Sequence, residues 1–160
     1  MSDSVDHRRR LLLGAALSGV AAKAFAQAEP PARAVRAPSS KRLEPLRQVD
    51  AGVLKVAYYE EGPTDGPVVI LLHGFPYDIH SYVDVAPQLT AQGCRVIVPY
   101  VRGFGATRFR DSATLRSGEQ AAIGADVIAL MDALGIPRAV LAGHNWGGRV
   151  ACVAAAPLRP

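Results

Sequence analysis

The sequence predicts an α/β fold, with an open, mostly parallel β-sheet that carries helices on both faces. After Asp50, short runs rich in Val, Ile and Leu alternate with stretches of helical periodicity. Residues 68–72 form a continuous apolar run, as expected for a strand buried on both faces of a parallel sheet. Strands that alternate with helices form such a sheet, because each helix returns the chain to the start of the next parallel strand.

Four strands are expected, at residues 53–59, 68–72, 94–98 and 138–142. The turn cluster Gly-Pro-Thr-Asp-Gly-Pro at 62–67 separates the first two strands. A helix is expected from about 81 to 92, where Pro87 marks a break or a late start and Gly93 a stop. Residues 103–116 have the composition of a loop.

The next helix is expected to begin at a capping box, in which Ser117 accepts a hydrogen bond from the Gln120 amide. Its apolar stripe consists of Ile123, Val127, Leu130, Met131 and Leu134. Gly135-Ile136-Pro137 ends this helix, and a short Ala-rich helix is expected to run to about residue 156.

The first 26 residues predict a signal peptide. Arg8, Arg9 and Arg10 precede an apolar stretch too short to span a bilayer, and Ala24-Phe25-Ala26 fits a cleavage site. The consecutive arginines indicate the twin-arginine route, so we expect a bacterial periplasmic or secreted protein with no stable membrane anchor after cleavage. An uncleaved anchor or a basic amphipathic helix is the alternative.

Residues 27–50, which are rich in Pro and Arg, are expected to form a flexible linker, and residues 51–160 the folded domain. The net charge of +4 does not indicate nucleic-acid binding, because residues 49–160 carry nine basic and ten acidic groups. Cys94 and Cys152 lie in no metal-type spacing, and we expect both to pack as free thiols. No metal and no cofactor is expected.

The segment Gly143-His144-Asn145-Trp146-Gly147 predicts a nucleophile elbow between a buried strand and a helix. Glycines flank the central residue of such a turn because the backbone is strained and leaves no room for side chains. The central residue here is Asn145, an amide. A dinucleotide-binding domain is disfavoured, because the sequence lacks the pattern Gly-x-Gly-x-x-Gly.

A second motif, His73-Gly74-Phe75-Pro76, follows the strand expected at 68–72. Its position predicts a loop that donates one backbone N–H to an oxyanion hole, while the residue after the nucleophile donates the other. Phe75 and Trp146 would be these donors. The alternative is a simple turn with His73 as a buried structural histidine.

Together with these two motifs, the segment Arg102-Gly103-Phe104-Gly105 makes residues 51–156 similar to the α/β-hydrolase superfamily, in its epoxide hydrolase and haloalkane dehalogenase branch. The branch commonly has Gly-His-Asp-Trp-Gly-Gly at the elbow, and residues Gly143 to Gly148 match every position except Asn145. The resemblance implies hydrolysis of a small epoxide, halide or ester, in which an elbow aspartate attacks carbon and a histidine-activated water cleaves the ester.

The same resemblance implies that Trp146 helps to hold a departing halide, and that His144 is a usual filler of its position rather than a base. Tyr100 stands where the family usually has aspartate, so contacts of the 102–105 segment are open. His80 and Tyr82 are expected to be structural.

Asn145 predicts loss of the reaction, because an amide oxygen is a poor nucleophile, although asparagine tolerates the positive φ that the turn needs. In the family the acid and base follow the elbow, whereas here only fifteen residues follow and none is histidine. We therefore expect a truncated, inactive copy that lacks the cap and later strands, exposes a strand edge and self-associates there. Asn145→Asp alone should not restore activity. The alternative is a non-catalytic binding or assembly module, with a pocket between Phe75 and Trp146.

Overall fold

The structure, a computed structural model, describes residues 42–156, in which one six-stranded sheet organises the fold. The signal peptide expected at 1–26 and most of the expected linker lie outside these residues. The strands are β1 (Leu46–Ala51), β2 (Leu54–Glu61), β3 (Val68–Leu72), β4 (Arg95–Pro99), β5 (Arg108–Phe109) and β6 (Val140–Gly143). Their order is β1-β2-β4-β3-β6, and β5 pairs with β2.

The expected α/β architecture is confirmed, and its sheet is mixed. Strand β3 lies parallel to β4 and to β6, whereas β2 is antiparallel to β1, β4 and β5. Strands β1 and β2 are joined by a two-residue turn at Gly52 and Val53, and so short a connection permits only antiparallel pairing. The parallel part of the sheet, which includes β3 and β6, is the part that carries both predicted motifs.

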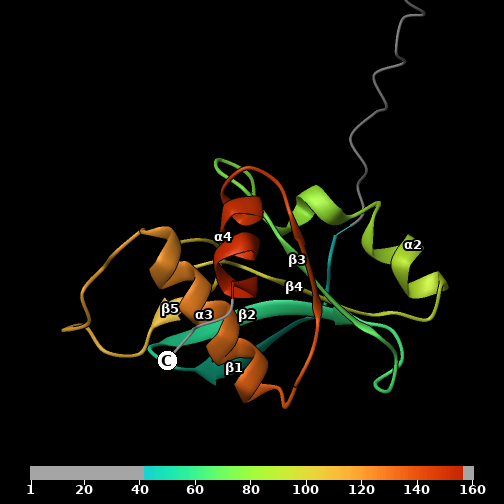
Figure 1. Ribbon diagram of the computed structural model, residues 1–160, viewed down its shortest axis with the longest axis horizontal. Helices are drawn as coiled ribbons and strands as arrows, with labels where there is room; N and C mark the ends of the chain where they lie inside the picture. Colours follow the sequence, from blue (N-terminus) through green and yellow to red (C-terminus); the bar gives the residue numbers. More distant parts are fainter. Residues whose placement is uncertain (1–41, 157–160) are drawn as a thin grey trace, which may run out of the picture. The chain divides into compact units, whose positions relative to one another are not determined.

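Helices cover both faces of the sheet (Figure 1). The helical elements are the 3₁₀ turn η1 (Ile79–Tyr82), α2 (Ala86–Ala91), α3 (Gln120–Ala133) and α4 (Trp146–Ala155). Ile70 and Leu72 of β3 pack in one apolar cluster with residues of α3 and α4, and Val69 and Leu71 pack in the other with residues of η1 and α2. The continuous apolar run of β3 is therefore buried on both sides, which confirms that prediction.

Two expected boundaries are wrong at the start of the domain. The linker expected over 27–50 ends earlier, because β1 begins at Leu46 and Leu43 is already buried. Strand β1 has the polar residues of an edge strand, with Arg47 and Asp50 exposed. The strand expected at 53–59 is β2 and extends to Glu61, since pairing with β4 continues to Glu61.

The helix expected over 81–92 is two elements, η1 and α2, and Pro87 lies in the first turn of α2. Proline fits a first turn, where its missing N–H is not needed, so it marks a late start. The predicted capping box is wrong. Glu119 is the N-cap of α3 without a side-chain cap, and the Ser117 hydroxyl accepts from the Glu119 N–H at 3.1 Å, because Ser117 lies two residues too early.

Strand β6 forms the unpaired edge of the sheet on the side away from β1. Its four residues are all apolar or glycine, and Val140 is 61% exposed. A cleft of about 350 Å³ beside it is lined mainly by apolar residues of α3, β6 and α4, among them Met131, Leu141 and Ala154. Cys94 and Cys152 are both free thiols, but Cys152 is exposed, so the expectation that it packs inside the fold is wrong. Within residues 42–156, every helix is too short or too polar to cross a bilayer.

Candidate active site at the strand-to-helix elbow

The elbow is the two-residue turn between β6, which ends at Gly143, and α4, which begins at Trp146. Asn145 has φ 54° and ψ −121°, and no other non-glycine residue among 42–156 has a positive φ. Asparagine adopts a positive φ more often than most residues, but this combination of φ and ψ lies outside the left-handed helical region and is unfavourable. The turn therefore holds the Asn145 side chain in one fixed direction at the end of the parallel strands.

Glycines allow the elbow to lie directly against the loop after β3. A Cβ on Gly147 would overlap the carbonyl oxygen of Leu72, and a Cβ on Gly74 would lie 2.7 Å from the Asn145 Cβ. No side chain fits at either position without moving the backbone. Residues His73–Pro76, here called the oxyanion loop, and the elbow form the two walls of the site.

Two backbone N–H groups, one from each wall, point at the same atom of Asn145. The Trp146 N–H donates to Oδ1 at 2.6 Å, and the Phe75 N–H donates to it at 3.3 Å. These are the two donors named from the sequence as an oxyanion hole. The structure places the side-chain oxygen of Asn145 at their meeting point, so the hole is filled by the residue in the nucleophile position.

His73 anchors the oxyanion loop to the neighbouring strand. Its ring is 1% exposed and Nε2 accepts a hydrogen bond from the Val101 N–H at 3.2 Å. Nδ1 therefore carries the proton and faces the Gly74 carbonyl oxygen at 3.3 Å. Burial lowers the pKa of His73 below its usual value, so the neutral ring is favoured. Phe104 packs edge-on against it, with ring centroids 4.8 Å apart.

Tyr82 joins the end of β3 to the elbow. Its hydroxyl donates to the Leu72 carbonyl oxygen at 2.8 Å, and its oxygen lies 3.3 Å from Nδ1 of His144. Because the hydroxyl hydrogen is used on Leu72, His144 donates from Nδ1 in this contact. Burial raises the pKa of Tyr82, which keeps the hydroxyl protonated. His80 and Tyr82 were expected to be structural, but the partners of Tyr82 could not be predicted, because contacts between segments distant in the chain leave no local pattern in the sequence.

Arg102 holds the loop that carries Gly103 and Gly105. Its guanidinium pairs with both carboxylate oxygens of Asp126 on α3, at 2.6 and 2.7 Å, and also donates to the Ser117 and Ala122 carbonyl oxygens. Such two-point pairing fixes the guanidinium plane.

Tyr100 replaces the aspartate of the family pattern and is buried beside Gly105. A Cβ on Gly105 would overlap the Tyr100 ring, so the glycine makes room for it. The contacts of the 102–105 segment, which the sequence left open, are therefore apolar packing against the Tyr100 ring. Thr107 supports this arrangement, because its hydroxyl donates to the Tyr100 carbonyl oxygen at 2.7 Å.

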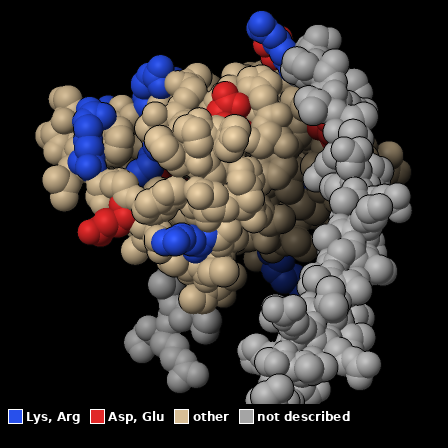
Figure 2. All heavy atoms as spheres, turned by 90° about the horizontal axis from the view of Figure 1, so that it is seen from above, with Lys and Arg blue, Asp and Glu red and all other residues tan. Residues whose placement is uncertain are grey.

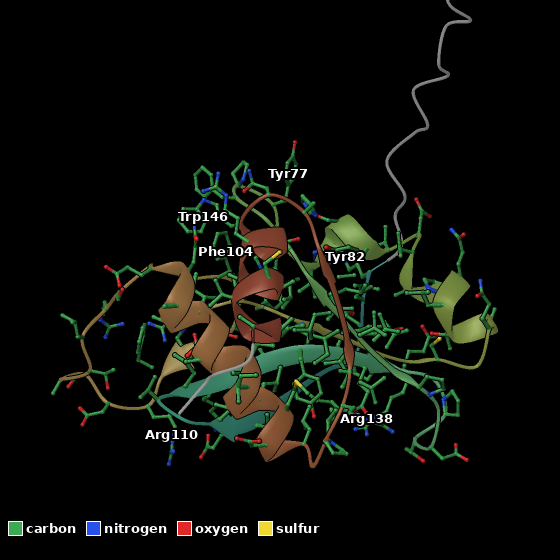
Figure 3. The ribbon with its side chains drawn as sticks, in the orientation of Figure 1. Tyr77, Tyr82, Phe104, Arg110, Arg138 and Trp146 are labelled. Atoms are coloured by element: carbon green, nitrogen blue, oxygen red, sulfur yellow. The ribbon has the colours of Figure 1, made fainter. Side chains whose placement is uncertain are left out.

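Exposed aromatic residues lie in and next to the two walls of the site. Phe75 is 66%, Tyr77 63% and Trp146 39% exposed. Figure 3 shows Tyr77, Trp146, Phe104 and Tyr82 at the upper end of the molecule, and Arg110 and Arg138 at the opposite end. Sequence reasoning missed Tyr77 and Phe104, although both lie in or next to the motifs used. Large exposed aromatic residues that cluster around one point mark a binding surface.

Charged side chains are sparse at this end of the sheet. Figure 2, which looks onto it from above, shows isolated acidic and basic groups on a largely uncharged surface. The segments 73–77 and 143–148 contain neither acids nor lysine or arginine. Among residues 42–156 no cluster of three His, Cys, Asp or Glu side chains is placed to hold a metal ion.

Comparison with known proteins agrees with these features. Residues 67–158, more than half of the chain, match the family described as alpha/beta hydrolase fold. Epoxide hydrolase A of Mycobacterium tuberculosis is 36% identical over 104 residues, which are 65% of this chain and 32% of that protein. A haloalkane dehalogenase of Mycobacterium marinum is 35% identical over 63% of this chain and 33% of its own length.

A solved structure gives the same result. A Klebsiella pneumoniae protein, proposed in its description to be an epoxide hydrolase, superposes with a TM-score of 0.69 and 53% identity over 71% of this chain and 37% of that protein. The chain thus spans about a third of the length of the relatives it matches. It belongs to the alpha/beta hydrolase fold family, and the relatives that it resembles include epoxide hydrolases and a haloalkane dehalogenase.

Proposed function

We propose that this chain forms the sheet, oxyanion loop and elbow of an epoxide-hydrolase-like protein, built on a scaffold for small epoxides, halides or esters, and that it does not itself carry out the covalent step. The observation that carries the proposal is the position of Asn145. It holds the backbone conformation of the nucleophile, and its side-chain oxygen accepts from both backbone donors.

The amide is chemically unsuited to the attack. The lone pairs of an amide oxygen are delocalised onto nitrogen and carry no charge, so Asn145 cannot form the ester intermediate that an aspartate would form. The oxygen that would be available for attack in a carboxylate is replaced by Nδ2, which carries two hydrogens and donates only. The geometry of the turn is retained while the reactive group is changed.

The histidines of the described segment also leave the site without a base. His73 uses Nε2 to accept from Val101, His80 contacts Asp78 at 3.0 Å, and His144 contacts Tyr82. A general base must lie within hydrogen-bond reach of the water that it activates. No contact joins any of these three rings to the Asn145 side chain, so we expect Asn145→Asp alone not to restore turnover.

Turnover measurements test this proposal. The purified chain should not convert styrene oxide, 1-bromobutane or p-nitrophenyl acetate above the buffer rate. The Asn145→Asp variant should yield no sustained turnover and at most one equivalent of covalent ester, visible as a single mass increment by intact-protein mass spectrometry. Robust turnover by the unaltered chain that Asn145→Gly abolishes would overturn the proposal.

A non-catalytic binding module on the same scaffold is the second candidate function. The exposed rings of Phe75, Tyr77 and Trp146 favour it, since apolar side chains around a fixed polar group are typical of ligand sites. A binding module should stay soluble and monodisperse in size-exclusion chromatography, and persistent aggregation would count against it.

The expected export and truncation stay predictions. For export, N-terminal sequencing of the protein recovered from the bacterial periplasm should begin at Gln27. Replacing Arg9 and Arg10 by lysine should retain the protein in the cytoplasm if the twin-arginine route is used. For truncation, sequencing of the genomic DNA beyond the codon for Pro160 is the direct check, and a reading frame that supplies a histidine would support it.

A further inference from the structure

The Asn145 side chain has an accepting oxygen, Oδ1, on one branch of its amide and a donating nitrogen, Nδ2, on the other. Both backbone donors converge on Oδ1, so this atom must be the amide oxygen, and the donating Nδ2 lies on the other branch of the amide. The Cβ of Asn145 faces Gly74, which places the oxygen between the two walls of the site. The NH₂ group consequently points away from the walls.

Nδ2 has no hydrogen-bond acceptor among residues 42–156, and Asn145 is an exposed residue. The amide cannot turn over to hide this group, because rotation by 180° would aim Nδ2 at the two N–H donors and lose both bonds. The donor is therefore held in a single orientation by the protein before any ligand arrives. Such preorganisation reduces the entropic cost of binding.

The surroundings of Nδ2 define the chemistry of a ligand. Phe75, Tyr77 and Trp146, which belong to or adjoin the two walls, have exposed aromatic side chains. The two segments that carry these residues, 73–77 and 143–148, contain no carboxylate, lysine or arginine; the charged residues that follow them are Asp78, which contacts His80, and Arg149. Fixed donors in an apolar setting favour a neutral acceptor with an apolar body, because a charged ligand would lose its hydration without finding an opposite charge.

We propose that Asn145 makes the elbow a hydrogen-bond donor site, which binds an uncharged molecule with an acceptor oxygen, such as an epoxide or ketone, attached to an aromatic or aliphatic body. The inference rests on the proposed function, in that Asn145 binds the molecule and does not attack it. An aspartate at this position would present acceptor oxygens only, and its charge would repel the lone pairs of the same ligand.

The chain offers a direct spectroscopic test, because Asn145 is its only asparagine and Trp146 its only tryptophan. Labelling asparagine with ¹⁵N gives a single side-chain NH₂ pair in the NMR spectrum, which reports on Nδ2 alone. Trp146 fluorescence reports on the neighbouring ring. Four probes of similar size separate the chemical classes: styrene oxide, acetophenone, ethylbenzene without an acceptor, and benzoate with a charge.

Styrene oxide and acetophenone should shift the NH₂ pair in a saturable manner and bind roughly tenfold more tightly than ethylbenzene, which lacks the acceptor. The Asn145→Asp variant should lose roughly tenfold in affinity for acetophenone, and Thr90→Ala, which lies on α2 away from the site, should bind as the unaltered chain does. The labelled pair reports on binding even if the aspartate variant fails to fold.

Three results would overturn the inference: equal affinity for ethylbenzene, binding of benzoate that is tighter than that of acetophenone, or no shift of the NH₂ pair with any probe in a folded protein. Each leaves the proposed lack of turnover intact. Conversely, release of phenylethanediol from styrene oxide would contradict the proposed function and not the donor site, so the two failures are distinguishable.

Discussion

The two walls of the site are built in opposite ways. The oxyanion loop is fixed from inside the protein, where His73 is 1% exposed and both of its ring nitrogens have backbone contacts. The elbow lies at the surface, where Asn145 keeps an unfavourable φ of 54°, is held through Oδ1 by the Phe75 and Trp146 N–H groups, and has no acceptor for Nδ2 in the described segment. Buried hydrogen bonds stabilise the oxyanion loop, whereas the elbow exposes the Asn145 side chain to solvent.

This difference explains how a catalytic scaffold can keep its shape after its reactive group is replaced. A change at His73 would disturb the core, whereas aspartate and asparagine are nearly the same size and both can accept from Phe75 and Trp146 through an oxygen. The elbow position is therefore the one at which chemistry can change at little cost in stability. Substitutions in the walls should reveal this asymmetry.

The largest effect is expected where the walls touch. Gly147→Val should prevent folding or reduce the free energy of unfolding by more than about 4 kcal/mol, because its Cβ would overlap the Leu72 carbonyl oxygen. Urea unfolding followed by circular dichroism measures this. Gly118→Ala is the matched control, since no atom lies within 4 Å of its Cβ position, and its free energy of unfolding should stay within about 0.5 kcal/mol. Equal effects at both positions would refute close contact between the walls.

A smaller but still large effect on stability is expected in the oxyanion loop. His73→Leu should lower the free energy of unfolding by about 2–3 kcal/mol, because the part-buried Val101 N–H loses its acceptor and the buried ring is replaced. His80→Leu removes an exposed histidine that contacts Asp78 and should cost less than about 1 kcal/mol. If the two variants were equally stable in urea, His73 would not be an anchor.

The same histidine predicts a pH dependence. Its pKa is lowered in the folded protein, so at pH values below about 6.5 the unfolded chain takes up a proton that the folded chain does not. The contribution of His73 to the free energy of unfolding should therefore be fully present above this pH and should be lost as the pH decreases. Urea unfolding between pH 7.5 and 5 tests the sign, and His73→Leu should flatten this part of the curve. A gain in stability on acidification, restricted to proteins that retain His73, would contradict the assignment.

The smallest effect on stability is expected at the edge strand β6, which leads into the elbow. Val140→Lys places a charge on the apolar edge strand β6, where the side chain is 61% exposed, and should change the free energy of unfolding by about 0.5 kcal/mol or less. It should nevertheless reduce self-association measured by analytical ultracentrifugation. Leu115→Lys removes another exposed apolar side chain from a loop and should leave self-association unchanged. The reverse order would exclude pairing through β6.

The sequence was sufficient for the parts of the molecule whose causes are local. The apolar run of β3, the stripe of α3 and the glycines around Asn145 each act within a few residues, so their elements were predicted. The antiparallel pairing of β2 with β4 depends on contacts distant in the chain, and the short strand β5 depends on its partner β2. The Ser117 cap was misplaced because the Ser117 hydroxyl accepts from the Glu119 N–H, so that the helix has its N-cap two residues later.

The site divides in the same way. Phe75 and Trp146 were named because the turn motifs fix their backbone positions. The Tyr82 contacts with Leu72 and His144, and the Nε2 contact of His73 with Val101, join segments up to 62 residues apart and left no pattern in the sequence. That Oδ1 of Asn145 occupies the meeting point of the two donors could be seen only once both walls were placed.

Turnover of styrene oxide by the purified chain, followed as release of phenylethanediol, is the most direct test of the central claim that the elbow keeps its geometry and has lost its nucleophile. We predict no diol above the rate in buffer, with the Asn145 NH₂ resonances shifted by the unreacted epoxide. Catalytic diol release that disappears in Asn145→Gly, a variant without the side chain, would contradict it.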